Sequence, residues 1–327
     1  AIAVYGALQM RVNNNVMDYF SDDSSFSRYS DLLHEHLSGM QTFSILVSGQ
    51  TESFMQVLQL EELQTLQQFL EDSGKFDSSY SYADFIGVVH SGIDSETPTS
   101  PYLPVRDEVV REYSQMLDTK VLRSFVSEDF GQARIIVRHN ISSSRELNES
   151  VAEIIGFAEQ WLAPGLSVQV TGESYLNNRA ADYMAGGQAR SLALMLAVIF
   201  LLVSLLFMQL KAGLIAVLAN VFPIICLFGI MGYMDLALDT GTAMVGAIAM
   251  GIAVDHGMHF MVRYQRAERS GGNALKNTVQ KEATPIIATA IALAMGFATL
   301  SLSEFPPVAR FGLLSALVML LALVSTF

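Results

Sequence analysis

An acid and two histidines stand inside a segment whose other residues are those of a membrane-spanning helix. From Thr240 to Val262, Asp255 is the one residue with a formal charge, and His256 and His259 follow it closely. At about 1.5 Å per residue, a helix over this segment is long enough to cross a bilayer. An ionised carboxylate at such a depth costs about 3 kcal/mol or more. A residue kept at that cost predicts an ion or proton pathway.

Residues four apart in a helix lie on one face, and here that face carries small side chains that lead to the acid. The series is Ala243, Ala247, Gly251, Asp255 and His259. Small residues let a second helix approach closely, as in most membrane helix contacts. We therefore expect this face to pack against another helix, so that Asp255 faces protein rather than lipid. His256 lies about 100° around the helix and is expected to meet a different neighbour.

Three interpretations of these side chains compete, and the favoured one is a proton relay of Asp255 with His259 and, less directly, His256. A low dielectric favours the neutral forms of both carboxylic acids and imidazoles, which suits proton exchange near neutral pH. A buried pair that only holds helices together is the structural alternative. A metal site is the weakest interpretation, because the histidine pair lacks the Glu of an H-E-x-x-H motif. With no nucleophile and no complete metal set, we expect neither an enzyme nor a cofactor.

Charge divides the 327-residue chain into two parts. Residues 11–187 hold 26 Asp and Glu against 11 Lys and Arg, a formal charge of −15, whereas the rest of the chain carries +2. An acidic soluble region argues against nucleic acid as a partner, because phosphates require a basic surface. The single cysteine, Cys226, lies in an apolar segment and excludes an intrachain disulfide.

Five apolar segments have the length and composition of membrane-spanning helices. They are Ser191–Met208, Ala212–Met231, Thr240–Val262, Thr284–Ser303 and Val308–Phe327, the last cut short by the end of the chain. Thr284 as N-cap and Pro285 at the first helical position predict where the fourth begins. The sequence thus predicts three parts: residues 1–10 as the end of a transmembrane helix, 11–187 as an outer domain, and 188–327 as a five-helix membrane domain.

The cations between the apolar segments predict the orientation. Arg263, Arg266, Arg269, Lys276 and Lys281 follow the acid-bearing segment, and the positive-inside rule assigns them to the cytoplasm. Counting back through the segments places residues 11–187 outside the membrane. The links around Asp235 and Glu304, which carry acids and no Lys or Arg, then also fall outside.

Within 11–187, strand and helix patterns alternate. Strands are predicted at Thr42–Ser48, Ala133–Arg138 and Leu166–Thr171, and helices at Glu52–Asp72, Arg106–Leu117 and Ser144–Leu162. Tyr80–Val89 leans helical, and the proline-rich stretch Ser91–Pro104 is predicted to be a loop. Two strand–helix–strand units side by side indicate an α+β domain with helices on one face of a sheet.

The sequence resembles the resistance-nodulation-division (RND) superfamily, with the MMPL-like, sterol-sensing-domain-like exporters as the nearest branch. The resemblance rests on Gly251-Ile252-Ala253-Val254-Asp255 with His259-Phe260 and Arg263-Tyr264, on Val16–Ser24, on Thr171-Gly172, and on Thr284-Pro285-Ile286. It implies a porter domain of ferredoxin-like βαβ units and makes Asp255 the proton-coupling residue. The chain then corresponds to one repeat and is expected to be a fragment of a longer protein. A second repeat of the same protein would be its partner. At His256 the sequence departs from the common pattern, which leaves the proton stoichiometry open.

The resemblance also implies a function, namely proton-motive-force-driven export of a lipid or other amphiphile by a multi-pass protein of the cytoplasmic (inner) membrane. The expected partners are membrane lipids, a hydrophobic substrate, the second repeat and further copies in a homo-oligomer. Two alternatives remain open: an auxiliary of protein secretion like the SecDF relatives, and a lipid-sensing regulator without transport. The identity of the substrate stays open.

Overall fold

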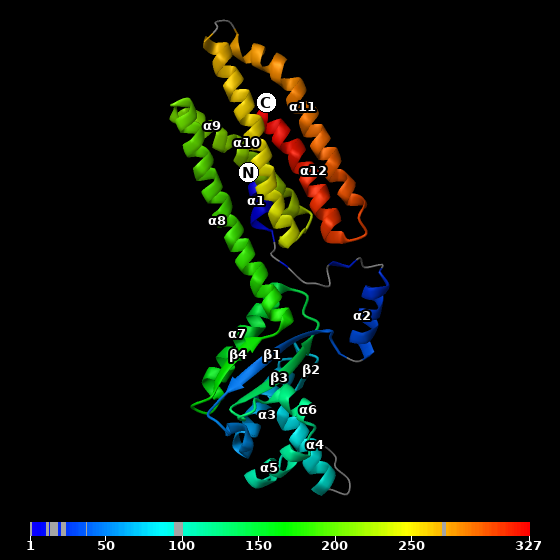
Figure 1. Ribbon diagram of the computed structural model, residues 1–327. Helices are drawn as coiled ribbons and strands as arrows, with labels where there is room; N and C mark the ends of the chain where they lie inside the picture. The colour runs from blue at the N-terminus through cyan, green and yellow to red at the C-terminus, as the bar shows by residue number, and fades with distance from the viewer. Residues whose placement is uncertain are drawn as a thin grey trace. The chain divides into compact units, whose positions relative to one another are not determined.

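The computed structural model describes residues 2–10, 13, 19–20, 24–36, 38–94, 101–269 and 273–327. Most of them are helical, and one small antiparallel sheet is present (Figure 1). The chain forms two compact units. We call Asp22–Asn178 the sheet unit, and Ala1–Ser21 with Arg179–Phe327 the helical unit.

The sheet unit holds four strands and its own helices. In chain order these are α2 (Ser25–His36), β1 (Gln41–Ser48), the short helix η2 (Ser53–Met55), α3 (Val57–Asp72), β2 (Ser78–Tyr80), α4 (Tyr82–Asp94), α5 (Asp107–Met116), α6 (Thr119–Phe125), β3 (Gln132–His139), α7 (Ser144–Trp161) and β4 (Ser167–Thr171). The strand order is β2-β3-β1-β4, and each neighbouring pair is antiparallel. In the register, Ile45 of β1 lies opposite Ile135 of β3 and Val170 of β4. The three strands predicted from the sequence therefore share one sheet.

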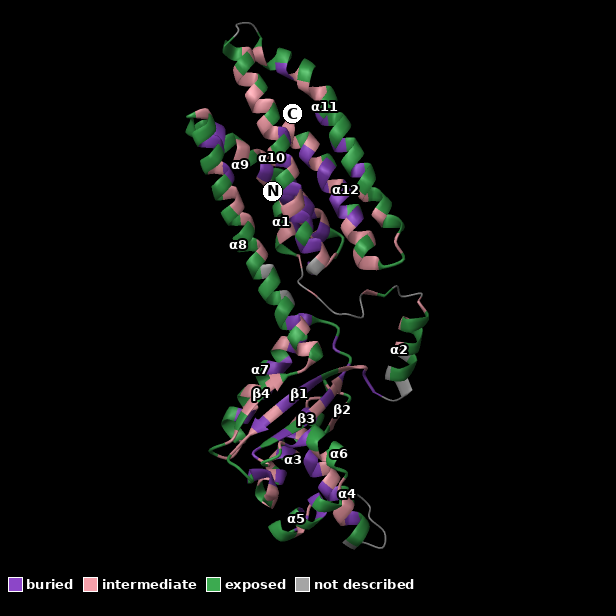
Figure 2. Cartoon of the chain, in the orientation of Figure 1, coloured by how far each residue is buried: buried purple, intermediate pink, exposed green. Residues whose placement is uncertain are grey.

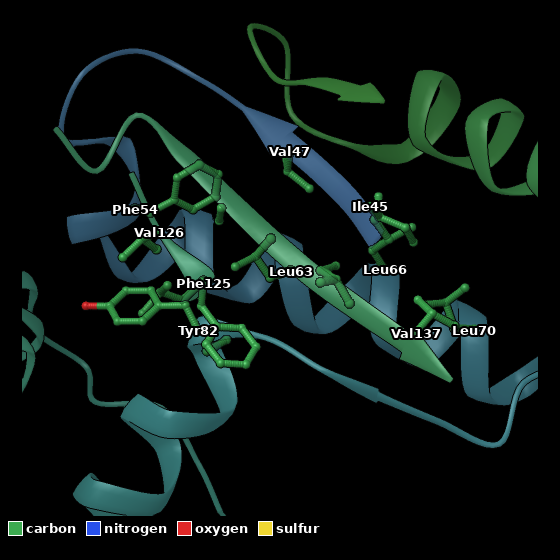
Figure 3. Close-up of a cluster of buried hydrophobic side chains, with 14 of the residues drawn as sticks. Ile45, Val47, Phe54, Leu63, Leu66, Leu70, Tyr82, Phe125, Val126 and Val137 are labelled. Carbon is green, nitrogen blue, oxygen red and sulfur yellow. The ribbon is translucent and has the colours of Figure 1, made fainter. Parts of the chain in front are cut away.

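The core of the sheet unit lies between the sheet and the helices α3 and α7. Alternate residues of a strand point to the same face, and in β1 and β3 the buried set is Phe43, Ile45, Val47, Ala133, Ile135 and Val137. Leucines of α3 pack with them (Figure 3). Apolar residues of α7 belong to the same cluster. Burying each large side chain contributes about 1.5–3 kcal/mol. Both predicted helices thus pack on the sheet through their apolar faces, as expected.

The ends of two helices in this unit follow the expected local rules. After α3 the backbone turns at Gly74 with φ 63°, the left-handed conformation that glycine adopts without strain. At the start of α7, the Ser143 hydroxyl oxygen accepts a hydrogen bond from the Glu146 amide, 3.4 Å away. Ser143 is therefore the N-cap, one residue before the helix.

The sequence prediction was wrong for part of the stretch Ser91–Pro104. Helix α4 continues through Ser91 to Asp94, residues 95–100 lie outside the described residues, and 101–104 form a loop. Ser91 is buried, donates a hydrogen bond to the Gly87 carbonyl at 2.8 Å and accepts one from the Tyr102 amide at 3.0 Å. These contacts extend the helix beyond the point where the prolines suggested a loop. Strand β2 and helices α2 and α6 were not predicted.

The helical unit contains α1 (Ile2–Leu8), α8 (Glu173–Phe207, which begins in the sheet unit), α9 (Leu210–Tyr233), α10 (Thr240–Arg269), α11 (Ala274–Ala298), the short η3 (Thr299–Leu302) and α12 (Pro306–Thr326). Among the described residues, five of these helices are long and apolar enough to cross a membrane. Each of them overlaps with one of the five predicted segments. Helix α8 runs without interruption through position 187, where the sequence suggested the end of the outer domain.

Close contacts between glycines hold α1 against α9. A Cβ atom added at Gly6 would collide with the Gly229 carbonyl oxygen, and one at Gly232 would collide with the Gly6 carbonyl oxygen. The Tyr233 hydroxyl also donates to the Ile2 carbonyl at 3.1 Å. Small residues at a membrane helix contact allow this approach of two backbones. Helix α12 carries a series of buried positions and packs against α9, α10 and α11 (Figure 2).

The predicted start of the fourth membrane segment was wrong. Helix α11 begins at Ala274, where the Asn273 side chain caps it by accepting a hydrogen bond from the Lys276 amide at 3.3 Å. Pro285 therefore lies inside the helix and Thr284 is not its N-cap. A membrane helix tolerates an interior proline because neighbouring groups satisfy the freed backbone atoms. The Thr284-Pro285 pair resembles the start signal of a helix. The turns of α11 before it are polar, so no apolar pattern indicated that the helix begins earlier.

Candidate functional site

Helix α10 carries the predicted site and is firmly capped at its start. The Asp239 carboxylate accepts hydrogen bonds from the Thr242 amide at 2.7 Å and the Thr242 hydroxyl at 2.9 Å, and the Thr242 oxygen lies 2.8 Å from the Asp239 amide. Both residues are buried. This exchange satisfies amides that a helix start otherwise leaves unpaired. It sets the position of α10, from which the site side chains project.

Asp255 and His259 lie together on one face of α10. The Asp255 Oδ1 and His259 Nε2 atoms are 3.5 Å apart, which the four-residue spacing within one helix produces. Both side chains are largely exposed in this chain, 66% for Asp255 and 68% for His259. The structure therefore brings together the two residues that the sequence placed first in the relay, and it leaves them open on the surface of the helical unit.

The small-residue face of α10 contacts the chain at its beginning and not at the acid. Ala243 is buried, Ala247 is half-buried and Gly251 is exposed, with no atom within 4 Å of a Cβ placed on Gly251. Close packing on a helix of the described chain thus occurs at the Ala243 end alone. At Gly251 and Asp255, the described residues do not include the second helix that the sequence predicted would pack on this face.

His256 belongs to a different contact. Its side chain is buried, and Nε2 lies 3.3 Å from the Thr289 hydroxyl oxygen of α11. The Thr289 hydroxyl oxygen also lies 3.0 Å from the carbonyl oxygens of Pro285 and Ile286. Nδ1 of His256 is buried and has no hydrogen-bond partner among the described residues. As the 100° offset predicted, the His256 side chain meets a different helix from the face that carries Asp255 and His259.

One turn beyond His259, the same face continues to an ion pair between helices. The Arg263 guanidinium Nε contacts the Glu282 carboxylate of α11. The Glu282 side chain is 15% exposed and that of Arg263 is 45% exposed. Glu282 was not predicted as a site residue, because it lies among the cations of a segment that the sequence assigned to a link between helices. The pair ties α10 to α11 at the end of the helices that carries the cations.

Chemically, the site offers an acid and a base in reach of one another and nothing that would complete a metal centre. Within the described residues, no group of three or more His, Cys, Asp or Glu side chains is arranged to hold a metal ion. A carboxylate can accept a proton and an imidazole can accept or donate one, so the two groups have the chemistry that a proton relay requires.

The sheet unit offers no comparable arrangement among its described residues. His139 is fully buried, and burial lowers its pKa to about 4. Its Nδ1 accepts from the Ile141 amide at 3.1 Å and its Nε2 lies 2.9 Å from the Ser174 hydroxyl. A cavity of about 670 Å³ beside α3 is lined by polar side chains, two of which, Gln67 and Asp84, are hydrogen-bonded to each other at 2.8 Å. His139, Gln67 and Asp84 thus have hydrogen-bond partners within the fold, which favours a structural role for these three side chains.

Five apolar helices and an ionisable pair on one of them define a polytopic membrane protein. The family model for the MMPL family matches residues 27–327. The chain therefore belongs to the MMPL family. It is also similar to MJ1562 of Methanocaldococcus jannaschii, whose name describes a membrane protein, with 28% identity over 157 residues. That match covers 47% of this chain and 40% of the relative, so it spans less than half of either protein.

Proposed function

We propose that the protein exports a lipid or another amphiphile across the cytoplasmic membrane, driven by the proton-motive force. The observation that carries the proposal is the Asp255–His259 pair, with 3.5 Å between carboxylate and imidazole, on a helix long enough to span a membrane. Ionisable residues inside a membrane are rare and mark ion or proton pathways. Membership in the MMPL family supports transport as the use of that pathway.

The exposure of the pair supports a second surface that covers it. A charged side chain facing hydrocarbon is costly, and intramembrane acids face other protein or water. Since Gly251 leaves open space next to Asp255, a helix could approach α10 closely at this point. We propose that a second repeat of the same protein lies there, and that the complete transporter is a homo-oligomer of such two-repeat chains.

The topology of the sheet supports a porter domain. β1 connects to β2 through α3, β3 connects to β4 through α7, and each connection passes over one intervening antiparallel strand. This order resembles the split βαβ arrangement of ferredoxin-like folds, with α4, α5 and α6 between β2 and β3, and it supports the proposal. We propose that the sheet unit is the extracytoplasmic porter domain through which the substrate leaves the membrane.

The distribution of cations supports that orientation. Arg263, Arg266 and Arg269 lie in the last turns of α10, and Lys276 and Lys281 lie early in α11, so that all five gather at the same end of this helix pair. Cysteine labelling from outside the cell tests the sidedness in a Cys226→Ser background. Glu128→Cys, exposed in the sheet unit, should react with an impermeant reagent, and Glu268→Cys, exposed near the end of α10, should not. The opposite pattern would reverse the proposed topology.

The coupling follows from the two charge states of the pair. An ionised Asp255 must be paired or hydrated, whereas the protonated acid can donate one hydrogen bond to a helix opposite. Protonation from outside and release inward through His259 would therefore favour two different contacts of α10. A shift between two such contacts can move the porter domain between open and closed forms.

Proton-coupled transport in proteoliposomes that contain the intact protein tests the proposal. Asp255→Asn should reduce transport driven by a pH gradient at least tenfold while leaving insertion intact, because the amide cannot exchange a proton. His259→Ala should reduce it less. Glu304→Gln, a matched neutralisation of an exposed acid between η3 and α12, should transport normally. Full coupled transport by Asp255→Asn would return the pair to a structural role.

A further inference from the structure

A groove in the surface of the sheet unit runs across α3. The cavity of about 670 Å³ is lined by residues of α3, β2 and α4, and a second, more open hollow of about 500 Å³ lies between α3 and Phe157 of α7. Gln64 and Gln68 line both, so the two hollows meet along α3. We call them together the α3 groove. All of its residues belong to the sheet unit, so it is separate from the proposed proton pathway.

The polar side chains of the α3 groove are amides, hydroxyls and carboxylates. Glutamine, serine, threonine, aspartate and glutamate line it, and among the described residues no Lys, Arg or His does. Carboxylates without a cation repel phosphate and carboxylate groups, which disfavours nucleotides and acidic glycans. Amides and hydroxyls both donate and accept hydrogen bonds. The lining therefore favours a ligand without negative charge that carries many hydroxyl groups.

The carboxylates of the groove are not gathered into a cation site. Asp84 accepts a hydrogen bond from the Gln67 amide at 2.8 Å, and Asp72 accepts one from the Gln68 amide at 2.9 Å. Within the described residues, no three acidic side chains are arranged to hold a metal ion. The Gln64 side chain, in contrast, makes no hydrogen bond with another described residue and is available to a ligand. The paired side chains fix the walls in advance, which lowers the entropy that binding costs.

Aromatic rings form a row at one end of the groove. Phe69 and Phe157 line the second hollow and stack, with ring centroids 4.1 Å apart and 12° between the planes. Trp161 continues the row at 6.3 Å and 25° from Phe157. These two residues lie four apart on α7, which places them on one face of the helix. Trp161 is the single tryptophan of the chain and is 63% exposed, so the row ends in a flat apolar ring that is open to solvent.

A sugar ring matches both parts of the groove. One face of a pyranose presents C–H bonds that pack on the electron-rich face of an aromatic ring, and the hydroxyls at its edge donate and accept hydrogen bonds. A hydrocarbon chain would leave the amides of the groove without partners. Sites for small molecules have volumes of about 300–1,000 Å³, and each of the two hollows lies in this range. Two adjoining hollows of this size fit more than one sugar ring.

We propose that the α3 groove binds a neutral oligosaccharide, with one sugar ring stacked on Trp161 and the next rings along α3. Gln64, Gln68 and Glu71 form hydrogen bonds with the hydroxyls of those rings. The site needs no proton gradient and does not rest on the proposed export function. It gives the sheet unit a polar ligand of its own.

Soluble tetrasaccharides test the proposal. Neutral tetrasaccharides of glucose, mannose, galactose and N-acetylglucosamine are titrated separately against the full-length protein in phosphatidylcholine nanodiscs, and saturation-transfer NMR detects binding. At least one should bind, and the C–H protons of one ring face should receive the most saturation, because they lie on Trp161. Tetragalacturonate should bind about tenfold more weakly or not at all, because its carboxylates meet those of the groove. Spermidine should not displace the neutral sugar.

Variants separate stacking from hydrogen bonding. Trp161→Ala should weaken binding about five- to tenfold, whereas Trp161→Phe keeps a stacking ring and should retain most of the affinity. Gln64→Ala should weaken binding about fivefold, the worth of one hydrogen bond. Tyr29→Ala, at an aromatic residue that is 66% exposed on α2, and Gln115→Ala, at an exposed glutamine of α5, are the matched controls. Neither residue lines the groove, so both variants should bind like the wild type.

The form of the saccharide is a separate question, because a free or polymeric glycan and a glycolipid headgroup share this chemistry. Nanodiscs that also contain a diglycosyl diacylglycerol distinguish the two sources. Displacement of the tetrasaccharide by this lipid would identify a headgroup as the ligand, and the absence of displacement would identify a soluble or polymeric glycan. The saccharide site is supported in both cases, since the tetrasaccharide itself carries no lipid.

The outcomes are decisive without reference to transport. No binding of any neutral tetrasaccharide would overturn the proposal, and displacement of the sugar by spermidine would make the groove a cation site instead. Unchanged binding by both Trp161→Ala and Gln64→Ala would place the sugar elsewhere, with the same consequence. The comparison of neutral and acidic sugars in the wild type needs no variant, so misfolding of a variant would not remove the test. Asp255→Asn should bind the sugar normally, which keeps a failure of proton coupling apart from a failure of this site.

Discussion

His139 in the sheet unit and the Asp255–His259 pair in the helical unit show opposite ways of placing a titratable group. His139 is fully buried, and both of its ring nitrogens have partners from its own unit. Asp255 and His259 are two-thirds exposed and contact each other within one helix. A buried group with hydrogen-bonded partners is part of the packing that holds its unit together, whereas an exposed pair within one helix is not. The sheet unit should therefore respond to substitution through stability, and α10 through transport.

The largest effect on stability is expected from the core of the sheet unit. Leu63→Ala removes a fully buried side chain between α3 and the sheet and should lower the free energy of unfolding by about 2–5 kcal/mol. Hydrogen exchange of the β1 and β3 amides in the intact protein measures this loss. Leu58→Ala provides the control, because Leu58 is exposed on the same helix. Equal effects of the two changes would contradict the assignment of the core.

Acid should destabilise the sheet unit through His139. Burial lowers the pKa of this imidazole from 6.5 to about 4, so the folded state binds the proton less readily than the unfolded chain. The stabilisation is complete above pH 6.5 and is lost as the pH falls through 4, and it amounts to about 3 kcal/mol. Hydrogen exchange between pH 7 and 4 measures the change. His139→Gln should flatten this pH dependence, and an equally steep decline in the variant would assign it to other groups.

A smaller effect is expected at the start of α10. Asp239→Ala removes the buried carboxylate that accepts two hydrogen bonds from Thr242 and should destabilise this helix end by about 1–2 kcal/mol. Thermal unfolding of the purified protein in detergent gives the change. Asp239→Asn keeps an acceptor and should recover most of the loss. If Asn and Ala variants behave alike, the cap does not depend on the hydrogen bonds.

The smallest effect on stability should occur where the effect on transport is greatest. Asp255→Asn and His259→Ala should each change the free energy of unfolding by less than about 0.5 kcal/mol, because exposed side chains far from packing contacts contribute little. The same thermal unfolding assay, applied to the variants used for transport, checks this. A loss of several kcal/mol would show that the pair is a structural contact in the complete protein and would remove the contrast with His139.

Local patterns were sufficient for most of the elements. The alternation in Thr42–Ser48 and Ala133–Arg138 predicted β1 and β3, because a strand with one buried face repeats every two residues. Long apolar runs predicted the five membrane helices, since every backbone group must be satisfied in lipid. Strand β2 was missed because it has three residues and no alternating apolar pattern. Helix α11 was predicted to start too late because Thr284-Pro285 carries a local start signal inside a longer helix.

For the candidate site, the sequence by itself determined that Asp255 and His259 face the same way, because spacing within one helix requires no other part of the chain. It also determined the offset of His256. The tertiary structure alone decided that Thr289 receives His256 and that Glu282 pairs with Arg263. Each of these features depends on side chains from different helices. Their geometry depends on how the helices pack, and no local periodicity encodes it.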